Sequence, residues 1–317
     1  MGGKNATETL TADAGGIAHA ARILAEGGLV AVPTETVYGL AARADSAEAV
    51  AKIYAAKGRP GFNPLIVHVR DAVQAALYAE LAGDARVLAE RAWPGPLTLV
   101  LPRRADAALA EAVTAGLPTV ALRAPAHPAM RALLAACDFP LAAPSANRSG
   151  FISPTSAEHV RVSLDGRIDL ILDAGPCEAG LESTILAIRA DGVWDELRPG
   201  PVDLAALRAE HFTQAAPRGG ARSGIEAPGQ LASHYAPGKP VRLDAGAAAD
   251  DEFHIGFGAI GGDSTLSASG DLAEAAARLY ACLHRGARSD KPRIAVAPVP
   301  HEGLGKAIND RLRRAAA

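Results

Sequence analysis

The residues best able to do chemistry in this 317-residue chain gather between Val32 and His68. Pro33-Thr-Glu-Thr-Val-Tyr-Gly-Leu40 supplies neutral hydroxyls, and Lys57-Gly-Arg-Pro60 supplies two cations around a glycine. The macrodipole alone can explain a lone lysine at a helix C-terminus. Two cations followed by a stiffening proline favour anion binding, because arginine offers planar bidentate contacts to phosphate and lysine a point charge. The run therefore predicts a site for an anionic ligand lying across a sheet.

A second polar stretch follows an apolar strand expected at residues 141–143. It reads Ala143-Pro-Ser-Ala-Asn147-Arg-Ser-Gly150. Similar short runs of small and polar residues occur at Glu182-Ser-Thr184 and Arg198-Pro-Gly200. Open α/β sheets bind ligands just beyond the carboxyl ends of their strands. An ordinary turn rich in serine, asparagine and glycine is the alternative reading of the first stretch alone.

Two charged or titratable residues end expected strands. Arg123 ends Thr119-Val-Ala-Leu-Arg123, where it is equally a surface group or an anchor for a carboxylate. His68 ends another strand, and a lone histidine is more often structural than catalytic. Glu35 and Glu182 interrupt motifs otherwise poor in acids, and their roles are left open.

Apolar periodicity shows which elements position these side chains. The helix at 17–27 has Ile17, Ala20, Ala21 and Leu24 on one face. The expected helices cover residues 17–27, 46–57, 127–136, 155–164, 271–284 and 304–315, and the expected strands cover 29–32, 65–69, 97–101, 119–123, 141–143, 170–173, 183–188, 240–244, 252–257 and 293–297. Alternating strands and helices favour an α/β sheet, whose parallel or mixed character stays open.

A change in composition after about residue 207 predicts two domains. Residues 215–229 are rich in glycine, proline, alanine and arginine, which is typical of a linker. We expect a catalytic α/β domain at residues 1–207, a linker at 208–239 and a compact α/β domain at 240–317.

Composition excludes several classes of protein. The net charge of −3 gives no global attraction to nucleic acid or an anionic membrane. The first 16 residues lack the apolar core of a signal peptide, and no uncharged apolar run is long enough to span a bilayer. Three distant cysteines without a CxxC pair fit a reducing cytoplasm, so we expect a cytoplasmic protein. Gly256-Phe-Gly-Ala-Ile-Gly261 matches a dinucleotide fingerprint only weakly, because no helix opens directly behind it.

Taken together and in order, these motifs resemble the Sua5/YciO/YrdC family over nearly the whole chain. The motifs that carry the resemblance are Pro33–Leu40, Lys57–Pro60, Asn63–His68, Trp93–Thr98, Thr119–Arg123, Pro144–Asn147, Leu197–Gly200, Pro228-Gly229, His234–Pro237, Gly303–Ile308 and Asp310–Leu312. The last four indicate the two-domain Sua5 type. One departure is Ala227-Pro-Gly-Gln230, where many relatives have serine and methionine. The resemblance implies a YrdC-like twisted open α/β sheet with a concave ligand cleft, a linker crossing the active site and a small Rossmann-like C-terminal domain.

The resemblance also implies an activity. Members of the family make L-threonylcarbamoyladenylate and pyrophosphate from L-threonine, bicarbonate and ATP, a nucleotidyltransferase reaction. The product supplies the threonylcarbamoyl group for t6A37 modification of tRNA by a downstream transferase complex. Mg²⁺ is expected as the cofactor, held mainly by the ATP phosphates and not by protein side chains.

Site residues are carried over by the same resemblance. The L-threonine-binding residues it implies are Thr36, His68, Arg123, Ala143 and Ser183. The ATP-binding residues it implies are Arg59, Asn63, Thr119, Ser145, Ser153, Arg198 and Tyr235. The catalytic residues it implies are Lys57, Arg59, Ser145 and Asn147. We further expect Tyr235 to fold back over the nucleotide and exclude water.

Other functional classes stay open at this point. The main alternative is a double-stranded RNA- or tRNA-binding module without adenylylation activity, supported only by the cluster of arginine and lysine. A carbamoyl-transfer module like that of hydrogenase maturation factors would carry zinc-finger and acylphosphatase segments, and neither is visible. A dinucleotide oxidoreductase would depend on residues 256–261 alone.

Overall fold

Two β-sheets organise the chain in the computed structural model, which describes residues 6–189, 193–211, 225–230 and 234–317. Within this part of the chain, the larger sheet has the strand order β1-β8-β2-β3-β7-β4-β6-β5-β9-β10. Its strands are β1 (Glu8–Thr11), β2 (Val30–Pro33), β3 (Tyr38–Arg43), β4 (Ile66–His68), β5 (Leu97–Pro102), β6 (Thr119–Arg123), β7 (Leu141–Ala142), β8 (Leu170–Asp173), β9 (Thr184–Ile188) and β10 (Trp194–Arg198). The sheet contains parallel pairs, such as β4 with β6, and antiparallel pairs, such as β2 with β3, so it is mixed.

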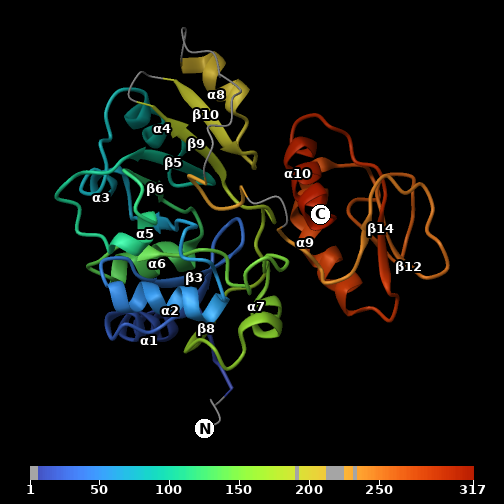
Figure 1. The fold of residues 1–317 in the computed structure, drawn as a ribbon, viewed down its shortest axis with the longest axis horizontal. Helices are drawn as coiled ribbons and strands as arrows, with labels where there is room; N and C mark the ends of the chain where they lie inside the picture. The colour runs from blue at the N-terminus through green and yellow to red at the C-terminus, as the bar shows by residue number, and fades with distance from the viewer. Residues whose placement is uncertain (1–5, 190–192, 212–224, 231–233) are drawn as a thin grey trace.

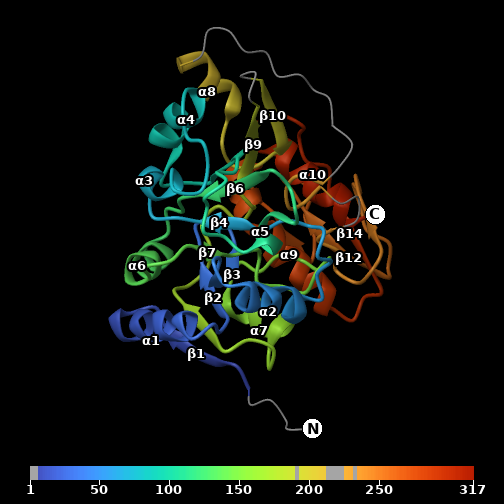
Figure 2. The ribbon, with the colours of Figure 1, turned by 60° about the vertical axis from the view of Figure 1, so that its left-hand side comes forward.

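Helices cover this sheet and bury its aliphatic side chains. They are α1 (Ala14–Ala25), α2 (Ala47–Lys57), α3 (Ala72–Ala75), α4 (Asp84–Ala92), α5 (Glu111–Thr114), α6 (Pro128–Ala136), α7 (Ala157–Leu164) and α8 (Leu204–His211). α1 and α6 pack side by side over one core cluster, while α2 and α4 cover the other main cluster (Figures 1 and 2). The cores are aliphatic because alanine, leucine, isoleucine and valine supply most of their residues.

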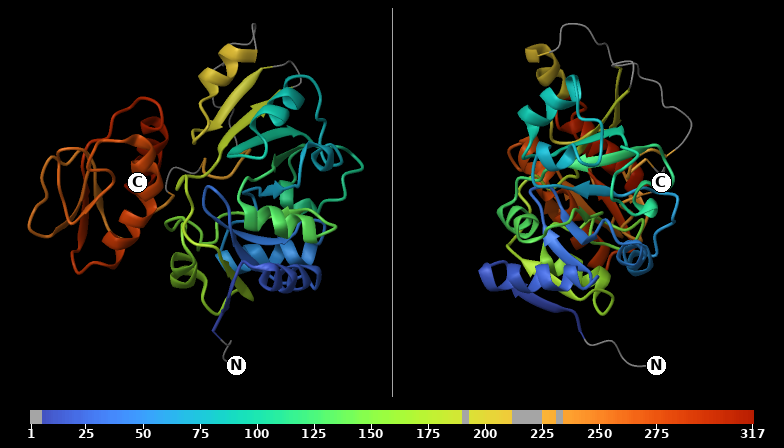
Figure 3. Two further views of the ribbon diagram at one scale, coloured as in Figure 1. Left: turned by 180° about the vertical axis from the view of Figure 1, so that it is seen from behind. Right: turned by 90° about the vertical axis from the view of Figure 1, so that its left-hand side faces the viewer.

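The second sheet is small and parallel. Its order is β11-β14-β12-β13, with β11 (Val241–Arg242), β12 (Glu252–Gly256), β13 (Ser264–Thr265) and β14 (Arg293–Val296). The helices α9 (Leu272–Arg288) and α10 (Gly305–Ala315) lie on the side of this sheet that faces the larger one (Figures 1 and 3). The parallel order and the covering helices agree with the α/β unit expected at the C-terminus.

The two sheets share an apolar cluster. Val37, Ile152 and Leu181 from the larger part pack in one buried group with Leu279 and Tyr280 of α9. We therefore call this contact region the junction. The boundaries 1–207, 208–239 and 240–317 remain a proposal, and α8 runs across the first of them. Half of the expected linker, at 212–224 and 231–233, lies outside the described residues.

The expected fold class is confirmed, and the main strands and helices fall within a few residues of their expected places. The expected elements lack β3, because no strand was predicted for Tyr38–Arg43. β3 pairs antiparallel with β2 and five of its six residues are buried. A strand that is buried on both faces lacks the alternation of apolar and polar residues by which a strand is predicted.

Among the described residues, no helix combines the length and apolar character that a bilayer-spanning segment needs.

Candidate active site

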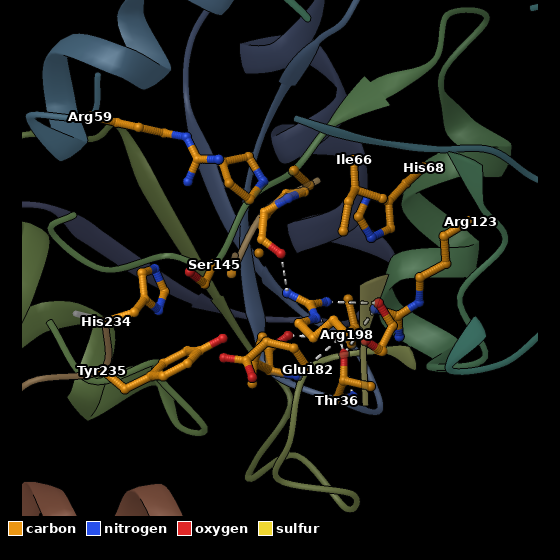
Figure 4. A pocket seen from close by; sticks show the side chains of 18 residues that line it. Thr36, Arg59, Ile66, His68, Arg123, Ser145, Glu182, Arg198, His234 and Tyr235 are labelled. Carbon is orange, nitrogen blue, oxygen red and sulfur yellow. Dashed lines mark hydrogen bonds between the residues drawn. The ribbon is translucent and has the colours of Figure 1, made fainter. Parts of the chain in front are cut away.

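One pocket opens where several strand ends of the larger sheet meet the chain after β10. Its walls combine cations, hydroxyls and a few apolar groups, with a single histidine-tyrosine pair from the later chain (Figure 4). The lining residues are Thr34, Thr36, Val37, Gly39, Arg59, Ile66, His68, Arg123, Ala143, Pro144, Ser145, Glu182, Ser183, Arg198, Pro228, Gly229, His234 and Tyr235. Arg59 and Arg123 approach from opposite sides in Figure 4.

The turn between β2 and β3 presents two threonine hydroxyls. Thr34 Oγ1 accepts from the backbone N–H groups of Thr36 and Val37 and donates to the Val37 carbonyl at 2.7 Å. Such a side-chain turn replaces backbone hydrogen bonds that the tight connection cannot make. It places Thr36 Oγ1 2.8 Å from Thr34 Oγ1 and fixes both hydroxyls at the pocket wall.

Arg123 is held by three different acceptors. Its guanidinium donates to Thr36 Oγ1 at 2.9 Å, to Glu35 Oε1 at 2.7 Å and to the Gly95 carbonyl at 3.2 Å. Glu35 is fixed in turn by the backbone N–H of Ala126. Burial opposes the charged form of Glu35, but the neighbouring Arg123 outweighs it and holds the pKa of Glu35 below its usual value. A guanidinium in this setting keeps donors for a further carboxylate in a fixed direction.

His68 stands beside Arg123 because β4 and β6 run parallel and pair these two residues in register. Burial, with a smaller effect of Arg123, lowers the pKa of His68 to about 3, so its imidazole is neutral near pH 7. His68 Nδ1 is one of the buried side-chain atoms that lack a hydrogen-bond partner within the described part of the chain. The ring can therefore serve a polar ligand without adding charge to the pocket.

The end of α2 fixes the second polar stretch. Gly58 adopts the left-handed conformation at φ 60° and ends the helix directly after Lys57, which glycine does without strain. Lys57 Nζ donates to the carbonyls of Ser145 and Asn147, both at 2.5 Å, and lies 3.4 Å from Asn147 Oδ1. Burial lowers the pKa of Lys57, yet three acceptors favour the ammonium, since a neutral amine has only two N–H groups. Lys57 thus holds the Ser145–Asn147 loop from behind.

Two further arginines supply positive charge to the pocket. Arg59 donates to the carbonyls of Asn63 and Pro64, and burial lowers its pKa only to about 10, so it stays charged. Arg198 donates to the Ser183 carbonyl and hydroxyl and to the Pro228 carbonyl. Neither arginine has a carboxylate hydrogen-bonded to it in these contacts, so both keep net charge for an anion.

Residues after β10 close one side of the pocket. Pro228, Gly229, His234 and Tyr235 all line it, and Tyr235 is held at a positive φ of 64° with 1% of its surface exposed. Burial lowers the pKa of His234 to about 3, which keeps this imidazole neutral. Within the described residues, the Tyr235 hydroxyl and His234 Nδ1 are buried without a hydrogen-bond partner. Buried polar atoms of this kind mark places where a polar ligand can bind.

Among the described residues that line the pocket, Glu182 is the one carboxylate, and its oxygens accept from Ser153, Tyr280 and Arg311. No group of three or more histidine, cysteine, aspartate or glutamate side chains that could hold a metal occurs in the described residues. The donor set around the pocket therefore does not suit a protein-bound divalent cation.

The pocket brings together most of the residues singled out in the sequence. The predicted residues that line it are Thr36, Arg59, His68, Arg123, Ala143, Ser145, Ser183, Arg198 and Tyr235. Lys57 and Asn147 lie behind this wall in the loop contact described above. Asn63, Thr119 and Ser153 are not among the lining residues, and their ligand contacts stay predictions.

Three polar residues of the lining, Thr34, Glu182 and His234, lacked a predicted role. Thr34 sits in the same hydroxyl-rich run as Thr36, and His234 directly precedes Tyr235, so adjacency was the available signal. Glu182 stood out in its motif, but nothing in the sequence indicated its role, because its partners Tyr280 and Arg311 lie 98 and 129 residues further along the chain.

Comparisons with known proteins identify relatives of both parts of the chain. The Sua5/YciO/YrdC family model, described as telomere recombination, matches residues 22–200, and the model of the threonylcarbamoyl-AMP synthase C-terminal domain matches residues 202–317. A Bacillus subtilis protein called threonylcarbamoyl-AMP synthase is 40% identical over 98% of this chain and 95% of its own length. A protein of the same name from Pyrococcus abyssi is 38% identical, over 93% of this chain and 92% of its own length.

Solved structures show the same likeness. The crystal structure of P. abyssi Sua5 complexed with L-threonine superposes with a TM-score of 0.86 at 35% identity. The match covers 98% of this chain and 96% of that chain, so both sheets are included.

Proposed function

This chain belongs to the Sua5/YciO/YrdC family, and we propose that it joins L-threonine, bicarbonate and ATP into threonylcarbamoyl-AMP with release of pyrophosphate. The observation that carries the proposal is the meeting of two kinds of surface in one pocket. One wall, around Thr36, His68 and Arg123, is polar but close to neutral, because Glu35 compensates Arg123. The other, around Arg59 and Arg198, keeps unpaired positive charge.

The neutral wall suits a zwitterionic amino acid. Arg123 offers charge-assisted donors to the carboxylate of L-threonine, while the side chains of Thr36 and Ser183 offer hydroxyls. The threonine amine reacts with bicarbonate to give a carbamate and water. His68 stays neutral there and so does not draw the carbamate anion away from the nucleotide.

The cationic wall suits the triphosphate. The carbamate oxygen attacks the α-phosphorus of ATP, a new P–O bond forms, and the bond to the pyrophosphate oxygen breaks. The nucleophile is already an anion, so positioning and neutralisation of charge are the main tasks. Arg59 and Arg198 supply that neutralisation, and Ser145 and Asn147, held by Lys57, orient oxygens of phosphate or carbamate.

Several finer points belong to the proposal. Mg²⁺ would enter on the phosphates of ATP, because the pocket offers it no set of free carboxylates, and no step above depends on it. Tyr235 would cover the nucleotide and protect a mixed anhydride from water. The product would pass in the cytoplasm to a transferase complex that modifies tRNA.

A pyrophosphate-release assay tests the proposal. We expect release with ATP, L-threonine and bicarbonate together, a large decrease when bicarbonate is omitted, and little or none with serine or without amino acid. A double-stranded RNA- or tRNA-binding module without adenylylation activity would release none under any condition. Folded Lys57→Ala/Arg59→Ala protein turning over at the parental rate would contradict the assigned role of the cations.

A further inference from the structure

Glu182 poses an electrostatic problem in the proposed ATP site. It lies in the pocket wall next to Ser183, with 6% of its surface exposed, and shares the pocket with Arg59 and Arg198. A carboxylate in that position would repel polyphosphate and offset the charge of Arg198. The family motifs that resemble a nucleotide site do not explain why an acid stands there.

The smaller C-terminal unit resolves this conflict. Arg311 of α10 donates from Nε to Glu182 Oε2 at 2.9 Å, and the Tyr280 hydroxyl of α9 lies 2.9 and 2.8 Å from the two carboxylate oxygens. Ser153 donates to Oε1 at 2.5 Å. Three side chains therefore donate to the carboxylate oxygens, and two of them, Tyr280 and Arg311, come from helices of the smaller sheet.

Arg311 is built into the junction. Its side chain is fully buried, its NH1 donates to Asp310 Oδ2 at 2.9 Å, and its guanidinium carbon lies 5.5 Å from the centre of the Tyr235 ring. Burial favours the neutral form of Glu182, but Arg311 and Arg198 outweigh it and lower the pKa of Glu182 to about 2. Glu182 is thus charged, and Arg311 supplies the compensating charge from within the junction.

Backbone contacts fix the segment that carries Glu182. Gly180 approaches α9 so closely that an added Cβ would lie 2.4 Å from the Cα of Ala277. On the other side, His284 Nε2 of α9 lies 3.2 Å from the carbonyl of Ser153, the residue that also donates to Glu182. α9 therefore positions both segments that meet at the carboxylate.

We propose that Arg311 is a positioning residue for nucleotide binding, which neutralises Glu182 and fixes its carboxylate in the pocket wall. The C-terminal unit then sets the net charge of the ATP site without contacting the nucleotide. The inference rests on the proposed function in naming ATP as the anion.

The test measures binding of α,β-methylene-ATP by calorimetry, which requires no turnover. In Arg311→Met the carboxylate loses its compensating charge, and we expect binding at least ten-fold weaker, with L-threonine binding changed by less than about three-fold. The double variant Glu182→Gln/Arg311→Met removes both charges and should bind nucleotide within about three-fold of the parent, since neutral replacement of both partners of a buried pair is tolerated.

The control is Arg293→Met, which deletes an arginine of the same unit whose exposed partner is Asp251. It should bind nucleotide as the parent does. If Arg311 acts only through packing, the double variant will be as weak as Arg311→Met, and that result overturns the proposal, as does parental binding by Arg311→Met.

If Arg311→Met does not fold, the single variant Glu182→Gln still tests the proposal. Its amide oxygen can still accept from Tyr280 and Ser153, which both reach Oε1 of Glu182, and the variant must bind the nucleotide at least as tightly as the parent. A ten-fold loss in that variant overturns the proposal. Absence of pyrophosphate release by the parent chain would refute the proposed function but leave these binding results interpretable.

Discussion

The cations of the pocket differ in what holds them, and the difference matches their proposed tasks. Arg123 is paired with the carboxylate of Glu35, so the pair offers oriented N–H donors but carries little net charge. Arg59 in the pocket wall and Lys57 behind it are held by backbone carbonyls, which orient them without a carboxylate partner. An amino acid zwitterion needs the first arrangement and a triphosphate needs the second.

Arg123→Lys tests the first arrangement. Lysine keeps the charge but cannot bridge Thr36, Glu35 and a substrate carboxylate at once, because its donors lack the planar fork. We expect KM for L-threonine to rise at least ten-fold while KM for ATP changes by less than about three-fold. Steady-state pyrophosphate release measures both. Arg43→Lys, at a bidentate pair with Asp45 outside the pocket, is the matched control and should leave both constants unchanged.

Lys57→Met tests the second arrangement. Losing the ammonium releases the Ser145 and Asn147 carbonyls, so the loop that orients the reacting oxygens loses its support. Removing one such preorganising donor costs ~3 kcal/mol, and we expect kcat/KM to fall roughly 100-fold. Lys52→Met changes an exposed lysine of the same helix, which donates to the Gly27 carbonyl, and should behave as the parent. Equal activity in the two variants would contradict the role of Lys57.

The residue types in the sequence predicted many of the residues that line the pocket. Hydroxyls, cations and small residues recur at expected strand ends, and nine of those singled out line one pocket. Glu35 and Glu182 were visible in the same motifs, but their roles depend on pairing. Glu35 pairs with Arg123 and Glu182 with Arg311, and each pairing joins residues 88 or more positions apart. A single sequence gives no information on contacts of that range.

At the scale of elements, strand order decides which motifs meet. β4 and β6 are parallel neighbours, which sets His68 beside Arg123. β7 runs antiparallel to β4, so the chain leaving β7 reaches Ala143 beside Ile66, at the start of β4. Periodicity locates each strand but not its neighbours. In the order β1-β8-β2, the strand at residues 170–173 lies between two strands near the N-terminus. No local sequence pattern predicts such a crossover.

The contact between the 180–183 segment and α9 yields an element-scale prediction. Gly180 has a φ of +67°, and an added Cβ would lie 2.4 to 2.6 Å from the backbone of Ala276 and Ala277. Gly180→Ala must therefore move α9 away from the segment or strain both. We expect a loss of unfolding free energy of roughly 1–3 kcal/mol and at least a ten-fold fall in kcat/KM. Chemical denaturation and pyrophosphate release measure the two effects.

Gly116→Ala is the control for Gly180→Ala. Gly116 has a similar φ of +77°, but nothing lies within 4 Å of its added Cβ. It reports the cost of the backbone conformation alone, roughly 1 kcal/mol, without disturbing the junction. If Gly180→Ala loses no more activity than Gly116→Ala, close docking of α9 does not matter for the site.

For the whole molecule, the junction joins the two sheets through uncharged histidines. His159 of α7 and His284 of α9 stack with ring centres 3.9 Å apart and planes inclined by 13°. Burial lowers the pKa of His159 to about 4 and that of His284 to about 3. Burial likewise lowers the pKa values of His68 and His234 to about 3 at the pocket. Protonated His159 and His284 would repel each other across the stack. Proton uptake by this pair is therefore linked to separation of the two sheets.

The sign of this linkage predicts sensitivity to acid. A histidine whose folded pKa lies below the unfolded value of about 6.5 binds fewer protons when folded, so its contribution is intact above pH 6.5. That contribution is lost as the pH falls from about 6.5 toward 4 for His159 and toward 3 for the other three. Glu182, with its pKa of about 2, contributes stability that is lost only as the pH falls below about 4.5. As the pH is lowered, the unfolding free energy should therefore begin to decline near pH 6.5, well above the range in which carboxylates titrate.

His159→Asn isolates the junction's share of this decline. Asparagine keeps an acceptor for the Thr155 backbone N–H, which lies 3.3 Å from His159 Nδ1, but cannot be protonated. The linkage gives about 1.4 kcal/mol per buried histidine at pH 5.5, so the variant should lose about that much less unfolding free energy than the parent between pH 7.5 and 5.5. Urea titrations at the two pH values measure the difference. His301→Asn, at an exposed position, should leave the parental slope unchanged. Equal slopes in all three proteins would mean that the stacked pair opens to solvent, and that acid acts on the molecule elsewhere.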